Sequence, residues 1–171
     1  MWVKGLDGGY LETDGAVVRL GYNNRAWVTD FADDESVYWA YWHPYLGGSL
    51  SFDVDLSEVS CDCASGIYLV QADDGECSWG VKGQDAEPGC SRIEIMEANR
   101  LGFTTAAYPC EGGECDDDEE SRQRADMDTY GPGSEFTIDT TKMFNVQTRF
   151  EAESDDDDMP GDLVRIRTTL T

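Results

Sequence analysis

Apolar and polar residues alternate along several short stretches of the chain, and this alternation predicts β-strands. In residues 49–55 the apolar Leu50, Phe52 and Val54 alternate with polar residues, which is typical of a strand with one buried face. Residues 146–151 repeat the pattern less cleanly, and no long stretch carries the helical period. Turn-forming residues separate the predicted strands, which span residues 16–22, 37–42, 50–55, 66–71, 92–96, 135–139, 145–151 and 163–169.

Short strands without intervening helices favour an all-β fold, and we predict an antiparallel β-sandwich. At 171 residues the chain is long enough for one domain with a substantial core, so we predict a single domain over residues 1–171. Two acidic tracts, residues 111–120 and 155–158, are predicted to be solvated loops because like charges repel one another. The spacing of an EF-hand calcium loop is absent from both tracts, and we predict no metal site.

The charge of the chain excludes one broad class of partner. It carries 36 acidic and 12 basic residues, for a formal net charge of −24. Nucleic-acid binding needs clustered Lys and Arg to contact phosphates, so no nucleic-acid partner is expected. A neutral polymer is compatible with such a surface. No apolar run approaches the length of a membrane span, and no membrane partner is expected either.

Six cysteines accompany a single histidine, and no cysteine pair has the Cys-x-x-Cys spacing of a zinc site. This usage favours disulfides, an oxidising compartment and therefore secretion, although the first residues lack the pattern of a signal peptide. Cys77 and Cys90 bracket the loop before the predicted strand 92–96, and Cys110 and Cys115 bracket a tight turn. By position, each pair is a candidate disulfide.

The strand that begins at Arg92 carries the most informative chemistry. Residues two apart on a strand share a face, so Arg92 and Glu94 point the same way, whereas Glu97 at an odd offset points oppositely. One β-bulge after Glu94 would bring Glu97 back to the face of Glu94. Two carboxyl groups close together on one face are what a retaining glycosidase uses as nucleophile and acid/base.

Residues 90–99 resemble the catalytic strand of glycoside hydrolase family 7, the cellobiohydrolases and endoglucanases, in which the pattern is Glu-x-Asp-x-x-Glu followed by Ala-Asn. The same pattern occurs in family 16 laminarinase-like enzymes, so the flanking sequence decides between them. Close matches to family 7 also span residues 46–56, 67–70, 130–142 and 144–150, with a weaker match at residues 10–22. The resemblance implies a jelly-roll β-sandwich of the concanavalin A-like lectin/glucanase type, and an incomplete one, because the family's domain is considerably longer.

Carried over residue by residue, the resemblance implies that Glu97 is the acid/base, that Glu94 stands for the family's assisting Asp, and that Arg92 occupies the nucleophile position. An arginine has no oxygen to bond the anomeric carbon, and its guanidinium stays protonated. We expect Arg92 to pair with Glu94 and to disfavour an oxocarbenium-like transition state. In an alternative arrangement, Glu94 becomes the nucleophile opposite Glu97.

Four further residues are candidate substrate contacts. Met96 stands where the family has a tryptophan before the acid/base, and Tyr108 stands where it has a histidine. Trp79 lies in the short loop before the catalytic strand, where an exposed aromatic ring could stack on a sugar. Trp39 belongs to a dense aromatic patch, for which filling the core is the alternative to contacting sugar.

The function that the resemblance implies is a β-1,4-glucanase that acts on cellulose or a related β-glucan polysaccharide with retention of configuration. We expect such a protein to be secreted, monomeric and independent of any cofactor, because the chemistry uses carboxyl groups and water. The alternative is a non-catalytic carbohydrate-binding or wall-associated protein that kept the scaffold and lost the nucleophile. Restoring a glutamate at Arg92 distinguishes the two.

Overall fold

The computed structural model describes residues 2–6, 11–14, 17–21, 25–29, 47–60, 62–70, 91–111, 114–115, 121–153 and 162–171. In these residues the regular elements are all β-strands, and no helix is long and apolar enough to cross a membrane. The predicted all-β class is therefore confirmed. We predicted one domain; by its internal contacts the chain divides into two compact units, Met1–Pro44 and Tyr45–Thr171, which are described separately.

The first unit contains two antiparallel strand pairs. Strand β1 (Trp2–Leu6) pairs with β4 (Arg25–Thr29), and β2 (Leu11–Asp14) forms a hairpin with β3 (Val17–Leu20). The predicted strand at residues 16–22 corresponds to β3. The predicted strand at residues 37–42, with Trp39, lies outside the described residues.

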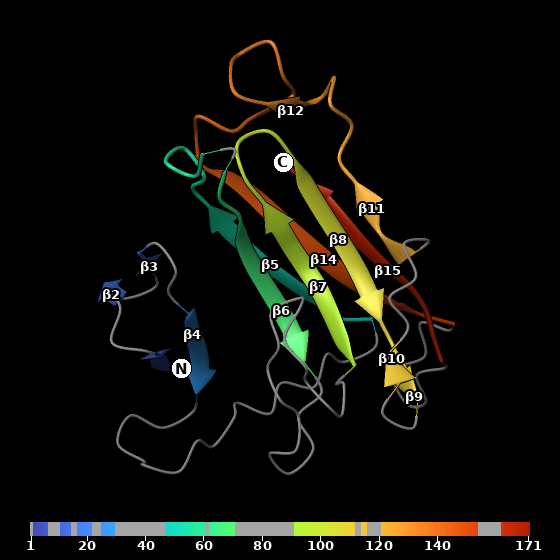
Figure 1. The fold of residues 1–171 in the computed structure, drawn as a ribbon. Helices are drawn as coiled ribbons and strands as arrows, with labels where there is room; N and C mark the ends of the chain where they lie inside the picture. The colour runs from blue at the N-terminus through green and yellow to red at the C-terminus, as the bar shows by residue number, and fades with distance from the viewer. Residues whose placement is uncertain are drawn as a thin grey trace. The chain divides into compact units, whose positions relative to one another are not determined.

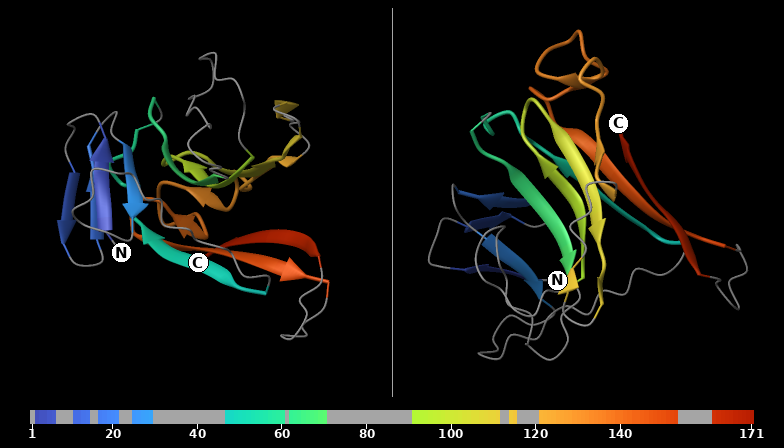
Figure 2. Two further views of the ribbon diagram at one scale, coloured as in Figure 1. Left: turned by 90° about the horizontal axis from the view of Figure 1, so that it is seen from below. Right: turned by 45° about the vertical axis from the view of Figure 1, so that its right-hand side comes forward.

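The second unit contains two larger sheets, which Figures 1 and 2 show as two layers. One sheet has four antiparallel strands and the other has three. In spatial order the first sheet comprises β11 (Gln123–Arg124), β8 (Phe103–Tyr108), β7 (Arg92–Ala98) and β6 (Ser65–Val70), and the second comprises β15 (Leu163–Leu170), β14 (Phe144–Ala152) and β5 (Ser49–Val54).

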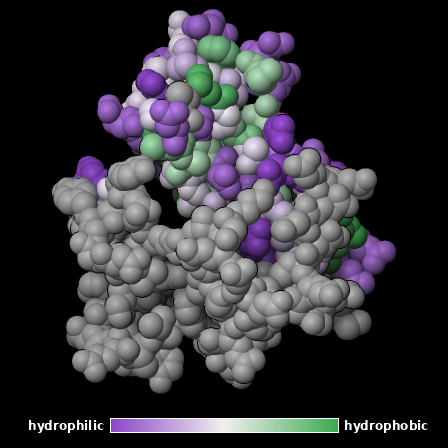
Figure 3. Space-filling model, viewed as in Figure 1, coloured by the Kyte–Doolittle hydropathy of each residue, from purple (hydrophilic) through white to green (hydrophobic). Residues whose placement is uncertain are grey.

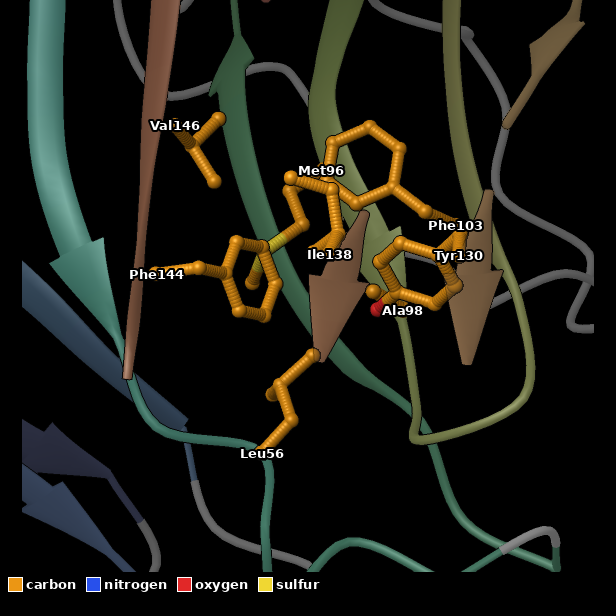
Figure 4. Close-up of a cluster of buried hydrophobic side chains, with 8 residues drawn as sticks. All are labelled: Leu56, Met96, Ala98, Phe103, Tyr130, Ile138, Phe144 and Val146. Atoms are coloured by element: carbon orange, nitrogen blue, oxygen red, sulfur yellow. The ribbon is translucent and has the colours of Figure 1, made fainter. Parts of the chain in front are cut away.

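The hydrophobic core of the second unit draws its side chains from both sheets. Strand β14 alternates as its sequence predicts, with Phe144, Val146, Thr148 and Phe150 buried and the residues between them turned outward. Burying a side chain the size of Val146 stabilises a fold by about 1.5 kcal/mol or more. The core cluster, drawn in Figure 4, consists of Leu56, Met96, Ala98, Phe103, Tyr130, Ile138, Phe144 and Val146.

Five predicted strands in this unit are found within two residues of their expected ends, as β5, β6, β7, β14 and β15. The prediction at residues 135–139 was wrong, because only β13 (Ile138–Asp139) is extended there, in a short parallel pairing with β12 (Tyr130–Gly131). Pro132 and Gly133, the latter with a φ of 137°, turn the chain between them. Strand β8 was not predicted, because its sequence FTTAAY alternates only weakly.

A β-bulge interrupts β7 after Glu94, as the motif required. On one side Glu94 pairs with Tyr68 and Met96 with Ile67, and on the other the pairing register shifts between Glu94 and Glu97. Two residues of β7 therefore lie opposite Thr105 alone, which is the arrangement of a β-bulge. The hydroxyl of Thr105 donates a 2.7 Å hydrogen bond to the backbone carbonyl of Glu94 and so supports the backbone at this point.

The segment 130–142, one of the close family 7 matches, fastens the turns at one end of the core. The Tyr130 hydroxyl donates to the carbonyl of Asn99 at 2.8 Å, and the Thr140 hydroxyl donates to that of Arg100 at 2.9 Å. The Asp139 carboxylate contacts Lys142 at 2.8 Å and also accepts hydrogen bonds from Thr141 and from the backbone of Gly133. The contact with Lys142 is the largest cause that holds the pKa of Asp139 well below its usual range, and the hydrogen bonds from Thr141 and Gly133 lower it further.

The same end of the unit exposes some large apolar side chains. Leu101, Met127 and Met143 lie in the turns there and are all exposed. In Figure 3 hydrophobic and hydrophilic residues are mixed over this region, around the position of β12 in Figure 1.

The structure does not describe the side chains of the cysteines in the two predicted disulfides. Strands β9 (Cys110–Glu111) and β10 (Glu114–Cys115) are antiparallel, and their register places Cys110 opposite Cys115. A disulfide between these two stays a prediction, and Cys77 and Cys90 lie outside the described residues. Cys63 is a free thiol.

The Asp139 contacts predict a pH-dependent contribution to stability. A carboxyl whose pKa is lowered by folding stabilises the protein above its unfolded pKa of about 3.9, and this contribution is lost as the pH falls through the folded pKa. We expect Asp139→Asn to lower the unfolding free energy at about pH 7 and to lower it less at about pH 2. Urea unfolding checks this, with Asp128→Asn, an exposed carboxyl in the preceding turn, as control. An Asp139→Asn penalty that is equal at both pH values would contradict it.

The bulge predicts a second effect. Thr105→Val keeps the shape of the side chain but removes its hydrogen bond to the Glu94 carbonyl, so we expect the unfolding free energy to fall by about 1 kcal/mol. Thr169→Val, on the exposed side of β15, is the matched control and should have little effect. Chemical denaturation of both variants measures the difference. Equal stability of the two would show that the bulge does not depend on Thr105.

Candidate functional site

The bulge places Glu94 and Glu97 on the same face of the four-stranded sheet. Met96 and Ala98 lie on the opposite face, inside the core. The register sets Glu97 opposite Thr104 on β8 and opposite Gly66 on β6. The outer face of β7 therefore carries two glutamates, with polar side chains of both neighbouring strands beside them.

Glu94 is almost fully buried, with 3% of its surface exposed, and its carboxylate is held by hydroxyl groups. The Thr104 hydroxyl lies 2.7 Å from Oε1, and the Tyr108 hydroxyl lies 3.5 Å from Oε2, at the long limit of a hydrogen bond. The Thr104 hydroxyl is also 3.3 Å from the backbone oxygen of Glu97. Both carboxylate oxygens of Glu94 thus face a donor on β8, as a buried polar group requires.

Glu97 is exposed, and its Oε2 accepts a 3.2 Å hydrogen bond from the hydroxyl of Tyr68 on β6. Burial raises the pKa of Tyr68, the negative charges of Glu97 and Glu94 raise it further, and the positive charge of Arg92 opposes the shift. Tyr68 therefore stays a hydrogen-bond donor over the whole neutral range. Its ring lies over Gly66, where even a single Cβ atom would collide with it, so the glycine makes room for the ring to reach Glu97.

Two arginines meet at Tyr108. The guanidinium carbon of Arg92 lies 4.1 Å from the centre of the Tyr108 ring, in a cation–π contact, and Nη2 of Arg122 donates a 2.6 Å hydrogen bond to the Tyr108 hydroxyl. This hydrogen bond raises the pKa of Arg122, and the negative charges of Glu94 and Glu97 raise it further, against the opposing effect of burial. Only 4% of the Tyr108 surface is exposed, so its hydroxyl contacts neighbouring side chains and not solvent.

The structure brings together four of the residues that the sequence singled out, namely Arg92, Glu94, Glu97 and Tyr108. The prediction that Met96 contacts substrate was wrong for this geometry, because the bulge turns its side chain into the core, where 1% of it is exposed. Trp79 and Trp39 lie outside the described residues. The ion pair between Arg92 and Glu94 stays a prediction.

Sequence reasoning missed three residues of the site, namely Tyr68, Thr104 and Arg122. The alternation of strand 65–70 does turn Tyr68 away from the neighbouring Ile67, but nothing in the sequence says that this strand lies beside β7. Thr104 lies on the unpredicted β8, and Arg122 directly precedes the two-residue strand β11. In the described part of the chain no group of three or more His, Cys, Asp or Glu side chains is arranged to hold a metal ion.

Comparisons with known proteins agree on one group of enzymes, although no family model matches the chain. Endoglucanase EG-1 of Hypocrea jecorina is 27% identical over 149 residues, which cover 70% of this chain and 32% of that protein. A GH7 family cellobiohydrolase from Daphnia pulex superposes with a TM-score of 0.53 at 21% identity, covering 73% of this chain and 43% of the other. A cellobiohydrolase from Melanocarpus albomyces, complexed with cellotetraose, gives 0.52 at 19% identity, covering 87% and 48%.

These matches cover most of this chain but less than half of each related protein. The chain spans about a third of the length of the endoglucanase and less than half of each structural neighbour. The neighbours have the β-sandwich jelly-roll architecture that the sequence predicts. The chain therefore has the fold of the glycoside hydrolase family 7 cellulases and resembles them, as a divergent and partial match, in sequence.

Proposed function

We propose that this chain recognises a β-1,4-glucan of the cellulose type on the outer face of the four-stranded sheet, at the site around Glu94 and Glu97. The observation that carries the proposal is the bulge in β7, which sets two glutamates on one face beside two tyrosines. The shared fold and the likeness to an endoglucanase support a glucan as the ligand, and a structural neighbour was solved with cellotetraose.

In this proposal Glu97 is the acid/base. It is exposed, so a glycosidic oxygen can approach it, and Tyr68 binds only Oε2, which leaves Oε1 to carry the transferred proton. A retaining enzyme also needs a nucleophile near the acid/base. The position that resemblance assigns to the nucleophile holds Arg92, which cannot form a glycosyl ester.

The surroundings of Glu94 argue against its taking over as nucleophile. Its carboxylate is buried, with Thr104 at one oxygen and Tyr108 at the other. An attack on an anomeric carbon would have to exchange these contacts for the substrate. The proposed activity of the natural chain is therefore glucan binding with little or no hydrolysis.

A hydrolytic glucanase is the second candidate, and one specific observation favours it. Glu97 is accessible and oriented by Tyr68, an arrangement that binding alone does not require. In this version Arg92 blocks turnover, because it occupies the position that the resemblance assigns to the nucleophile. We further propose that the protein is secreted and monomeric, which fits a polymeric glucan partner and six cysteines in the chain.

Restoring a carboxylate at Arg92 tests whether the site is catalytically intact. We expect Arg92→Glu to release chromophore from an aryl β-cellobioside at least about 100-fold faster than the natural chain, because nucleophile and acid/base are then both present. Adding Glu97→Gln should lower that rate again by about 100-fold, within the range of lost acid/base catalysis. Initial rates for purified, folded protein give both numbers.

Arg149→Glu makes the same change of charge on the other sheet and is the matched control. It should leave the rate at the background of the natural chain. A folded Arg92→Glu variant without turnover would refute the hydrolytic candidate and leave the binding candidate standing.

Binding is tested separately from hydrolysis. Tyr68 is 45% exposed beside Glu97, so its ring can stack on a sugar. We expect the natural chain to bind cellotetraose in calorimetry, and Tyr68→Ala to weaken this binding by about tenfold, in line with the loss of an aromatic contact of roughly 1 to 1.5 kcal/mol. Leu101→Ala, an exposed apolar residue in a turn, should bind as the natural chain does. If the natural chain does not bind cello-oligosaccharides, the proposed function is wrong.

A further inference from the structure

The contact between Arg122 and Tyr108 has a consequence for Glu94 that follows from counting hydrogen-bond groups. A tyrosine hydroxyl has one hydrogen to donate and two lone pairs, whereas a guanidinium only donates. At the 2.6 Å contact the Tyr108 hydroxyl must therefore accept. Its own hydrogen remains available, and the acceptor beside it is Oε2 of Glu94, 3.5 Å away.

We propose that Arg122 is a positioning residue of the site, which fixes the Tyr108 hydroxyl so that its hydrogen points at Glu94. With Thr104 at the other oxygen, the Glu94 carboxylate is then held in one orientation beside Glu97. The family resemblance predicts none of this, because it places a histidine at Tyr108 and singles out no residue at Arg122. Only the kinetic consequence of the proposal rests on the proposed function.

The backbone explains why Arg122 can reach this place. Strand β11 pairs Gln123 with Thr105 and Arg124 with Thr104, so the chain is tied to β8 at the two threonines that contact Glu94. Arg122 directly precedes this short strand. Its Nε is shielded from solvent and has no hydrogen-bond partner among the described residues, so the Tyr108 hydroxyl is the acceptor that the structure assigns to the guanidinium.

The ring of Tyr108 is restrained as well. Arg92 covers one side of it, and the side chain is almost completely buried. A tyrosine fixed at its ring can still rotate its hydroxyl hydrogen about the C–O bond. Arg122 removes that freedom, because it occupies one lone-pair direction.

The direct test is the exchange of the Tyr108 hydroxyl hydrogen with water, measured by NMR on the full chain with labelled tyrosine. We expect slow exchange in the natural protein and at least about tenfold faster exchange in Arg122→Met, with an intermediate rate in Arg122→Lys, which retains one donor group. Arg124→Met, two residues further on and exposed, is the matched control and should exchange as the natural protein does. Exchange as fast as in free tyrosine in the natural protein, or equal effects of the Arg122 and Arg124 variants, would overturn the proposal.

A second readout connects Arg122 to Glu94 and does not depend on activity. The side-chain carboxyl ¹³C resonance of Glu94 should move in Arg122→Met and in Tyr108→Phe, and the double variant should move it no further than Tyr108→Phe alone. Additive changes would mean that Arg122 does not act through Tyr108. In the Arg92→Glu background, Arg122→Met should lower kcat by about tenfold with KM unchanged. If Arg92→Glu is inactive, the proposed hydrolysis fails, while the NMR results still decide the role of Arg122.

Discussion

The site depends on one extra residue in strand β7. A regular strand would turn Glu94 and Glu97 to opposite faces, and one of the two carboxylates would then enter the hydrophobic core, where an unpaired charge is very costly. The bulge resolves this conflict, because Met96 and Ala98 fill the core while both glutamates lie on the outer face. The same strand thus packs against the core on one side and presents both glutamates on the other.

The neighbouring strands supply the side chains that contact the bulge and the two glutamates. Strand β8 supplies Thr105 to the distorted backbone and Thr104 to the Glu94 carboxylate. Strand β6 supplies Tyr68, which crosses the side-chain-free Gly66 to reach Glu97. The face is therefore organised by contacts between strands, and the segment 130–142 contributes by securing the end of the core beneath it.

The charges of the site differ from those that the family motif implies. The three carboxylates of the family motif repel one another. In this chain the first position holds the guanidinium of Arg92, which stacks on the ring of Tyr108. A second guanidinium, that of Arg122, meets the same tyrosine at its hydroxyl. Among the described residues of this face, two arginines lie beside two glutamates, in a chain whose net charge is −24.

The sequence by itself determined the all-β class, the main strands of the second unit, and the family likeness, because strand alternation and linear motifs are local properties of the chain. It also placed Arg92, Glu94 and Glu97 together and stated the condition under which they share a face. Only the tertiary structure decided that the bulge exists, that Met96 belongs to the core, and that Tyr68, Thr104 and Arg122 complete the site. These depend on which strands lie side by side and in what register, and register is fixed by packing between residues far apart in the sequence.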